Sequence, residues 1–141
     1  MEIREIRLST DLEDLYELLR QVWFLDNFEQ FKQNVLKVCL ESSWLVVEKN
    51  NKIVGSAILY FQHKVIRNGC VAGLIEEVIV DEIERGNGIG EKLVKQLVSE
   101  AFGQYNCYKV ILSCFDNRVE FYKRCGFEKE SNTMRINNEQ K

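Results

Sequence analysis

The sequence predicts an α/β fold in which one mixed central sheet of about six strands is flanked by about four helices. Three observations support this prediction. Short strand-like runs recur along the chain, amphipathic stretches with helical spacing lie between them, and glycines at 86, 88 and 90 separate a strand-like run from a helical one. No linker, repeat or low-complexity stretch divides the 141 residues, which we expect to form a single domain, 1–141.

The first third predicts a strand and two helices. Residues 2–8 alternate in polarity, as a strand does. Thr10-Asp11-Leu12-Glu13 is a capping-box sequence that predicts a helix start. The apolar residues behind it fall at helical spacing: Leu12, Leu15, Leu18, Leu19 and Val22. Asn27 is expected to cap a second helix, whose apolar positions are Phe28, Phe31, Val35 and Cys39.

The middle of the chain reads as three strands and a long helix. Residues 44–48 and 53–61 are strand-like, and Asn50-Asn51 between them suits a tight hairpin turn. Residues 71–80 form a further strand-like run. The helix after the glycines carries one apolar stripe: Leu93, Val94, Leu97, Val98, Ala101 and Phe102.

The last third predicts two strands around a short helix. Residues 108–114 are almost continuously apolar, which is typical of a buried central strand. Asp116 or Asn117 is expected to cap the helix, Gly126 to end it, and Phe127 to pack against that end. Residues 128–137 are expected to form a last, polar strand.

The composition disfavours several classes of protein. A net charge of -3 and a pI near 5.3 argue against a nucleic-acid partner, which needs a basic field. No apolar run reaches the roughly 20 residues that cross a bilayer, and the acidic first residues do not resemble a signal peptide, so no membrane association and a cytoplasmic location are expected. Five cysteines without paired spacing and a single histidine, His63, predict neither a disulfide framework nor a metal site.

The turn Arg85-Gly86-Asn87-Gly88-Ile89-Gly90 joins a strand-like run to a helix. Glycines allow a tight turn and close approach of a ligand, and the free amides of a helix N-terminus attract anions. A diphosphate fits such a site, although a plain connecting turn has the same pattern. A dinucleotide-binding motif would come early in the chain with an acidic residue about 20 residues later. A P-loop would contain Gly-Lys-Ser/Thr, which is absent here.

Two motifs carry a family resemblance. Arg-x-x-Gly-x-Gly at 85–90 resembles the diphosphate loop of the GNAT acetyltransferases, and residues 121–127 (FYKRCGF) resemble their closing segment. Between about 63 and 128 the chain is also similar to the glucosamine-6-phosphate N-acetyltransferases. The strings that carry this similarity are HKVIR at 63–67, GLIEEV at 73–78, CYKVIL at 107–112, VEFY at 119–122 and CGF at 125–127.

The resemblance implies a GNAT fold, a homodimer, and acetyl transfer from acetyl-CoA to the amine of glucosamine 6-phosphate, a step toward UDP-GlcNAc. It implies catalytic roles for Glu76, Glu77 and Tyr122. The cofactor-binding residues that it implies are Val78, Ile79, Val80, Arg85, Gly86, Asn87, Gly88, Ile89, Gly90, Glu91, Asn117 and Tyr122. The substrate-binding residues are Lys64, Val65, Ile66, Arg67, Glu76, Glu77, Val78, Tyr108, Lys109 and Arg135.

The chain departs from the family pattern in three places. Glu77 replaces an Asp in the acidic pair, and Ser113 replaces the Asp that usually ends the central strand. The Arg that the last strand donates to the neighbouring subunit would fall at Asn137, and Arg135, on the same strand face, could take its place.

The residues also suggest how the reaction would proceed. A phenol has a reference pKa of about 10 and a thiol one of about 8.5, so Tyr122 suits a hydrogen bond to the departing thiolate. A backbone amide near Val78 could bind the oxyanion if a bulge splays the strand. By strand alternation, Glu76 and Glu77 are expected on opposite faces.

Other functions remain open at this point. A GNAT enzyme could acetylate another small amine, a protein N-terminus or a lysine, although the cations Lys64, Arg67 and Lys109 disfavour a polyamine. An amino sugar is a weaker base than lysine, whose pKa is about 10.4, and it therefore needs a weaker catalytic base. The remaining alternative is a non-catalytic module that binds coenzyme A.

Overall fold

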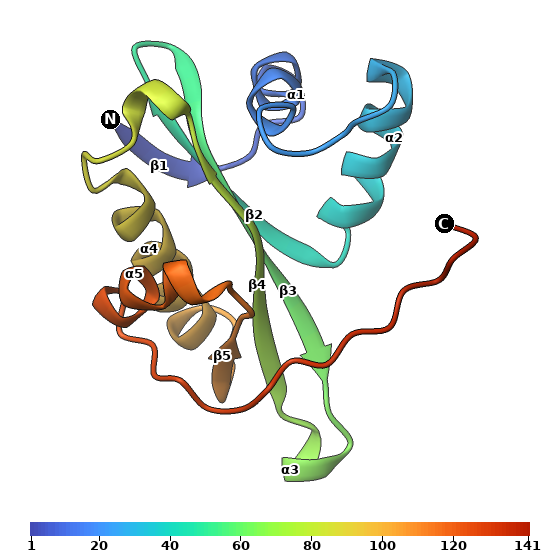
Figure 1. Cartoon of the computed structure of the whole chain (residues 1–141), viewed down its shortest axis with the longest axis vertical. Coiled ribbons are helices and arrows are strands. Elements are labelled where there is room, and N and C mark those ends of the chain that lie inside the picture. Colours follow the sequence, from blue (N-terminus) through green and yellow to red (C-terminus); the bar gives the residue numbers. More distant parts are fainter.

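The computed structural model describes residues 1–141 and contains one five-stranded sheet with the order β1-β2-β3-β4-β5 (Figure 1). The strands are β1 (Glu2–Glu5), β2 (Ser42–Lys49), β3 (Lys52–His63), β4 (Val71–Val80) and β5 (Lys109–Ile111). Neighbouring strands are antiparallel except β4 and β5, which are parallel. The mixed α/β fold is confirmed, with five strands in place of about six.

Helices cover both faces of this sheet, α1 and α2 on one side and α4 and α5 on the other (Figure 1). The helices are α1 (Leu12–Leu19), α2 (Phe28–Cys39), α3 (Ile66–Gly69), α4 (Ile89–Gly103) and α5 (Val119–Arg124). Two short 3-10 turns, η1 (Glu82–Glu84) and η2 (Asp116–Arg118), precede α4 and α5. The four expected helices are present, and α3 is an additional single turn between β3 and β4. No helix is both long and apolar enough to span a bilayer.

The core consists of two apolar clusters, one on each face of the sheet. Ala57 and Leu59 of β3 belong to the cluster under α4, whereas Ile58 between them belongs to the cluster under α1 and α2. All three side chains are fully buried. Because successive side chains of a strand point to opposite faces, β3 must be apolar at consecutive positions to fill both layers.

The helix starts in the first third differ in one respect from the prediction. Asn27 caps α2 as expected, since its side-chain oxygen accepts the amide of Gln30 at 2.9 Å. The capping box at Thr10 is absent: Asp11 occupies the N-cap of α1 and makes no capping hydrogen bond. Its carboxylate is instead held by the guanidinium of Arg4 at 2.7 and 2.9 Å. The Thr10 hydroxyl, which was expected to cap the helix, donates to this same carboxylate at 3.1 Å, so both side chains are engaged in a buried cluster with β1.

The hairpin turn between β2 and β3 forms as predicted. Asn50 and Asn51 have φ angles of 52° and 60°, the left-handed conformation that a two-residue hairpin turn requires. Lys49 pairs with Lys52 across this turn, so the register of both strands is set locally. At the ends of the predicted apolar stripes, by contrast, Val22 and Phe102 are exposed rather than buried.

The predicted strands of the last third are corrected by the structure. Residues 108–114 were expected to form a central strand, but only Lys109–Ile111 is a strand, and it lies at the edge of the sheet. Residues 128–137 form no strand, and their backbone makes no hydrogen bond to the sheet. This tail crosses the sheet and ends away from it (Figure 1). An alternating pattern predicts a strand only where its backbone pairs with an edge, and this tail pairs with neither free edge of the sheet, that of β1 or that of β5.

The helix α5 ends as predicted but begins differently. Neither Asp116 nor Asn117 caps it, because both lie within η2. At the other end, Gly126 has a φ of 100°, and its amide donates to Lys123 O at 3.0 Å. The amide of Phe127 donates to Tyr122 O, also at 3.0 Å, which completes a Schellman motif.

Candidate active site

The two parallel strands β4 and β5 are paired over a short stretch only. Ala72, Gly73 and Leu74 of β4 register with Lys109, Val110 and Ile111 of β5, and β5 then ends. From Ile75 to Val80 the edge of β4 that faces away from β3 therefore has no neighbouring strand. Its amides and carbonyls are available to a ligand, which an extended molecule could use in place of a strand.

A β-bulge lies in this unpaired part of β4. Ser56 of β3 pairs with Ile79 and Ile58 pairs with Glu76, so one residue of β3 faces Glu77 and Val78 of β4. Glu77 has a φ of 55°, a strained conformation for a residue other than glycine. Bulges of this kind often lie beside active sites, where they redirect side chains and backbone amides.

The bulge alters which side chains share a face. Ile75 and Val78 both pack in the cluster under α4, although they are three residues apart. Glu76 and Glu77, which lie between them, do not follow simple alternation, and the expectation of opposite faces is wrong. The carboxylates are close enough for the charge of Glu76 to raise the pKa of Glu77, in addition to the larger effect of burial. Neither carboxylate is paired with a cation of this chain.

The backbone of Val80 shows which groups face the free edge. The amide of Asp81 donates to Val54 O of β3 at 2.8 Å, so the preceding carbonyl, that of Val80, points the other way. There it accepts a hydrogen bond from Arg85 Nε at 3.0 Å. Since backbone groups alternate along a strand, those of Val78 also face the free edge.

The glycine turn joins this strand to α4. Gly86 and Gly88 have φ angles of 82° and 77°, and a Cβ atom at either would meet no protein atom within 4 Å. Gly88 is the N-cap of α4 and supplies no side-chain cap. The first amides of α4 therefore open onto free space, which is the arrangement that binds a phosphate or diphosphate.

Gly90 has a different role from the other two glycines. A Cβ atom there would lie 3.2 Å from the ring of Phe121 and 3.4 Å from a methyl group of Val80. Gly90 thus lets the start of α4 pack closely on β4 and α5. Next to it, Glu91 forms an ion pair with Lys95 at 2.6 Å and lies 4.0 Å from Arg124, so its negative charge is largely balanced beside the anion site.

Tyr122 of α5 lines a cavity of about 940 Å³ between the end of β5, α5 and the first part of the tail. Its ring contacts Phe121 and Phe127, with centroid distances of 4.9 and 6.0 Å. Burial raises the pKa of the Tyr122 phenol, and nearby Cys114 adds to this shift. The phenol therefore stays protonated at neutral pH, and its hydroxyl has no hydrogen-bond partner in the chain.

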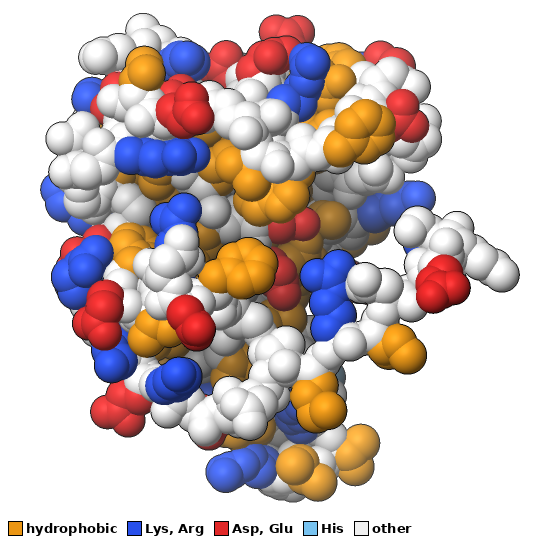
Figure 2. All heavy atoms as spheres, in the orientation of Figure 1, with side chains coloured by type: hydrophobic (Ala, Val, Ile, Leu, Met, Phe, Trp, Pro, Cys, Tyr) orange, Lys and Arg blue, Asp and Glu red, His pale blue; other side chains and the backbone are white.

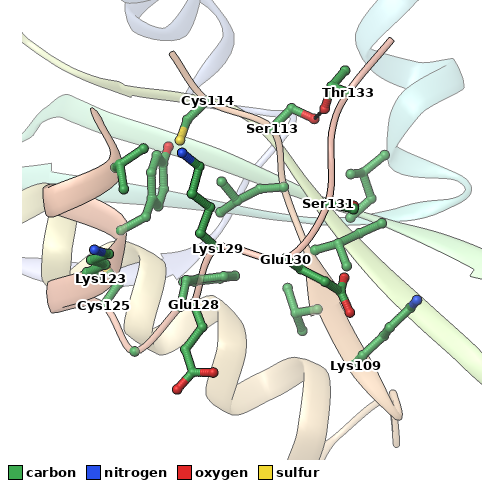
Figure 3. Close-up of a pocket in the computed structure, with 18 of the residues that line it drawn as sticks. Lys109, Ser113, Cys114, Lys123, Cys125, Glu128, Lys129, Glu130, Ser131 and Thr133 are labelled. Atoms are coloured by element: carbon green, nitrogen blue, oxygen red, sulfur yellow. Dashed lines mark hydrogen bonds between the residues drawn. The ribbon is translucent and has the colours of Figure 1, made fainter. Parts of the chain in front are cut away.

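Of the predicted site residues, Lys109 and Tyr122 line this cavity, and sequence reasoning missed the rest of its wall. Ser113 and Thr133 share a hydrogen bond of 2.9 Å that holds the tail beside β5, and Lys129 points toward Cys114 (Figure 3). The positions of Cys114 and residues 128–133 depend on the path of the tail. No local pattern in the sequence gives this path.

The predicted cationic residues lie at the far end of the β3–β4 hairpin. The Arg67 guanidinium lies 4.8 Å from the centre of the Tyr108 ring, and Lys109 Nζ lies 5.5 Å from it. Val65 and Ile66, beside them, are exposed. Five residues of β4 separate this end of the hairpin from Glu76, or roughly 17 Å along the strand.

Asn117 and Arg135 are on segments other than β4, the strand that contains the bulge. Asn117 lies in η2, before α5, and is exposed. Arg135 is in the tail, where its Nε donates to Asn137 Oδ1 at 2.7 Å. The space-filling view shows acidic and hydrophobic side chains in a hollow near the middle of this face, with basic side chains nearby on the surface (Figure 2).

A parallel pair that ends early, a bulge beyond its end and a helix that begins at glycines are the features that the predicted acetyltransferase site needs. The model of the acetyltransferase (GNAT) family matches residues 12–127, and the chain belongs to this family. It is 34% identical over 117 residues to "Glucosamine 6-phosphate N-acetyltransferase 1" of Dictyostelium discoideum, covering 80% of this chain and 70% of the relative.

Two further comparisons agree. A glucosamine 6-phosphate N-acetyltransferase of Schizosaccharomyces pombe is 38% identical over 93 residues, which are 64% of this chain and 83% of that protein. The crystal structure of glucosamine-6-phosphate N-acetyltransferase from Arabidopsis thaliana superimposes with a TM-score of 0.87 at 29% identity, covering 96% of this chain and 97% of that one.

Proposed function

We propose that the protein transfers the acetyl group of acetyl-CoA to the amine of glucosamine 6-phosphate, a step toward UDP-GlcNAc. The observation that carries this proposal is the pair of carboxylates at Glu76 and Glu77, which have no cation partner and stand at the opening between β4 and β5. Two adjacent carboxylates without a counter-ion are suited to an ammonium group. The similarity to relatives that bear this activity in their names supports the same acceptor.

The residues around the opening fit acetyl-CoA. Amides at the start of α4, from Gly86 to Glu91, would hold the diphosphate, and Arg85 would add a positive charge. The free edge of β4 from Val78 to Val80 would pair with the amide groups of the pantetheine arm. Asn117, in η2 just before α5, is the remaining residue that we assign to this ligand.

The chemistry follows from three groups. Glu76 or Glu77 accepts the proton that the ammonium must lose, directly or through water, and the raised pKa of Glu77 makes it a better base than an ordinary carboxylate. The Val78 amide donates to the oxyanion as nitrogen attacks the thioester carbon. When the C–S bond breaks, Tyr122 hydrogen-bonds the departing thiolate, and the second proton that the nitrogen loses passes to this sulfur, directly or through water.

The acceptor's phosphate requires cations. Lys64 and Arg67 lie at the end of the hairpin, roughly 17 Å from Glu76 along the strand, whereas Lys109 pairs with Ala72 and lines the cavity beside Tyr122. We therefore propose a homodimer in which the partner completes the phosphate site. Arg135, on a tail whose backbone makes no hydrogen bond to the sheet of its own chain, is our candidate for this contribution.

Two exposed features favour such a dimer. The tail backbone from 128 to 137 is unpaired with the sheet, and its side chains Met134 and Ile136 are 92% and 97% exposed. Val65 and Ile66 at the hairpin are also exposed. Apolar side chains and unpaired backbone on the same molecule are typical of surfaces that a second chain covers. The five free cysteines are consistent with work in the reducing cytoplasm.

A thiol-release assay tests the function. The protein is incubated with acetyl-CoA and, separately, with glucosamine 6-phosphate, glucosamine, spermidine, a lysine peptide and a peptide with a free N-terminus. We expect the highest kcat/KM with glucosamine 6-phosphate. A higher value with another amine would replace the proposed acceptor, and tight coenzyme A binding without thiol release from any amine would indicate a non-catalytic module.

A further inference from the structure

Tyr60 of β3 lies beside the acidic bulge but has no role in the site described so far. Tyr60 pairs with Leu74, and Ile58, two residues away, pairs with Glu76. Two paired residues share one face of a sheet, and so do residues two positions apart on one strand. Tyr60 and Glu76 are therefore diagonal neighbours on the face that α1 and α2 cover. At the usual diagonal separation of about 7–8 Å between Cα atoms, a tyrosine and a glutamate reach the same space.

The electrostatic environment of Tyr60 agrees with this placement. Burial and the charges of Glu77 and Glu76 raise its pKa to about 12, with a smaller contribution from Cys39 of α2. The phenol is therefore neutral at every physiological pH. Its ring packs against the cluster under α1 and α2 and is half-buried.

The hydroxyl of Tyr60 makes no hydrogen bond within the chain, whereas Tyr16 on the same side of the sheet donates to the carbonyl of Asp26 at 2.7 Å. Most buried or half-buried tyrosine hydroxyls have a partner. A free donor at the edge of a ligand site is therefore placed to serve the ligand.

We propose that Tyr60 belongs to the acceptor site and donates a hydrogen bond to a ring hydroxyl of the amino sugar. This proposal rests on the proposed function. A neutral donor needs a lone pair, and the substrate ammonium beside Glu76 and Glu77 has none. The phosphate is assigned to the cationic site that Arg135 of the partner subunit completes, so the ring hydroxyls are the acceptors left for Tyr60. Tyr60 would thereby favour a polyhydroxylated amine over a simple one.

The test compares Tyr60→Phe with Tyr105→Phe. Tyr105 is a matched control because it is also half-buried, packs against Phe61, and lies outside the site. We expect Tyr60→Phe to raise KM for glucosamine 6-phosphate about 3- to 10-fold, the usual effect of one neutral hydrogen bond. KM for acetyl-CoA and the melting temperature should stay unchanged, as should every parameter of Tyr105→Phe.

A second experiment identifies which ring hydroxyl of the sugar accepts the hydrogen bond from Tyr60. The 3-deoxy and 4-deoxy analogues of glucosamine 6-phosphate are measured as competitive inhibitors of wild type and Tyr60→Phe. For the hydroxyl that Tyr60 contacts, the losses of binding free energy caused by the variant and by the deoxy analogue should not add, because both changes remove the same hydrogen bond.

Three results would overturn either the role of Tyr60 or the proposed function. An unchanged KM in Tyr60→Phe, or fully additive losses with both analogues, would overturn the role of Tyr60. A parallel loss of thermal stability and of both substrate affinities would show a packing role instead. Wild-type protein that acetylates no amino-sugar phosphate would refute the proposed function itself, independently of the variant.

Discussion

The amide of Phe127 donates to the carbonyl of Tyr122 at 3.0 Å, and the two rings meet edge to face with their centroids 6.0 Å apart. The Schellman motif that ends α5 thus also fixes the ring of the residue assigned to the leaving thiolate. Gly126 makes this possible, because its φ of 100° is accessible to few other residues. The position of the Tyr122 hydroxyl is therefore set by backbone geometry and ring packing together.

Replacing Tyr122 by Phe should lower kcat about 10- to 100-fold and leave the Kd for acetyl-CoA within about 2-fold of wild type. The packing against Phe127 is kept, and only the hydrogen bond to the developing thiolate is lost. Single-turnover thiol release, combined with calorimetry of coenzyme A binding, measures both quantities. An unchanged rate under conditions where chemistry is limiting would assign Tyr122 to packing alone.

Replacing Gly88 by Glu should weaken coenzyme A binding by at least about 10-fold, which corresponds to about 1.4 kcal/mol. The new side chain would enter the open space at the start of α4, strain a φ of 77° and place a negative charge beside the diphosphate. Gly103→Glu is the control, because it adds the same charge near the other end of α4, where a Cβ atom also meets nothing within 4 Å. Calorimetry that finds equal affinity in Gly88→Glu and wild type would refute this site.

Replacing Glu77 by Gln should stabilise the protein at neutral pH while reducing kcat. The pKa of Glu77 is raised in the folded state, so the folded state binds this proton more tightly than the unfolded state does. Wild-type stability thus falls as pH rises from the unfolded pKa, about 4.3, through the folded one. Because the Glu77 residue remains exposed to solvent, which screens its charge, the melting temperature of the variant should exceed that of wild type by no more than about 1 °C at pH 7 and match it below pH 4.

The control for this experiment is Glu128→Gln, which removes an exposed carboxylate from the tail. Its melting temperature should follow that of wild type at both pH values. If the difference between Glu77→Gln and wild type were the same at pH 4 and pH 7, the desolvated carboxylate would not be its cause.

Mixing two variants of low activity tests the shared phosphate site. Arg135→Ala and Tyr122→Phe subunits, when combined and allowed to exchange, should regain one intact site in each heterodimer if Arg135 acts across the interface. Equal mixing would then recover about a quarter of wild-type activity, since half of the dimers are mixed and each has one of two sites intact. Demonstrated exchange without recovery would reject the shared site, and a monomer by light scattering at assay concentration would reject the dimer.

Local signals in the sequence predicted most of the elements. The turn at Asn50-Asn51, the cap at Asn27 and the stop at Gly126 each depend on the conformational preference of one or two residues, and all three are confirmed. The glycine turn before α4 is of the same kind: its two left-handed glycines and its uncapped helix are visible in the structure.

Features that depend on distant partners were missed or wrongly predicted. The Thr10 capping box was overridden because Arg4, seven residues before Asp11, binds the Asp11 carboxylate. The bulge at Glu77 is invisible in the sequence, because it is defined by the register with β3. The position of residues 128–137 depends on whether a neighbouring edge exists, which composition does not reveal.

The bulge shifts the alternation of the β4 side chains between the two faces of the sheet by one residue. This shift has a consequence for how the chain can vary through evolution. Ile75 and Val78 face α4, whereas Ile79 faces α1 and α2. Deleting one residue between Ile75 and Val78 would remove the bulge and leave Val78 facing α4 and Ile79 facing α1 and α2, whereas a deletion in a regular part of the strand would turn every residue beyond it over. Point substitutions leave this alternation intact, but insertions and deletions of single residues outside the bulge do not. The number of residues in this strand should therefore drift far less than their identity.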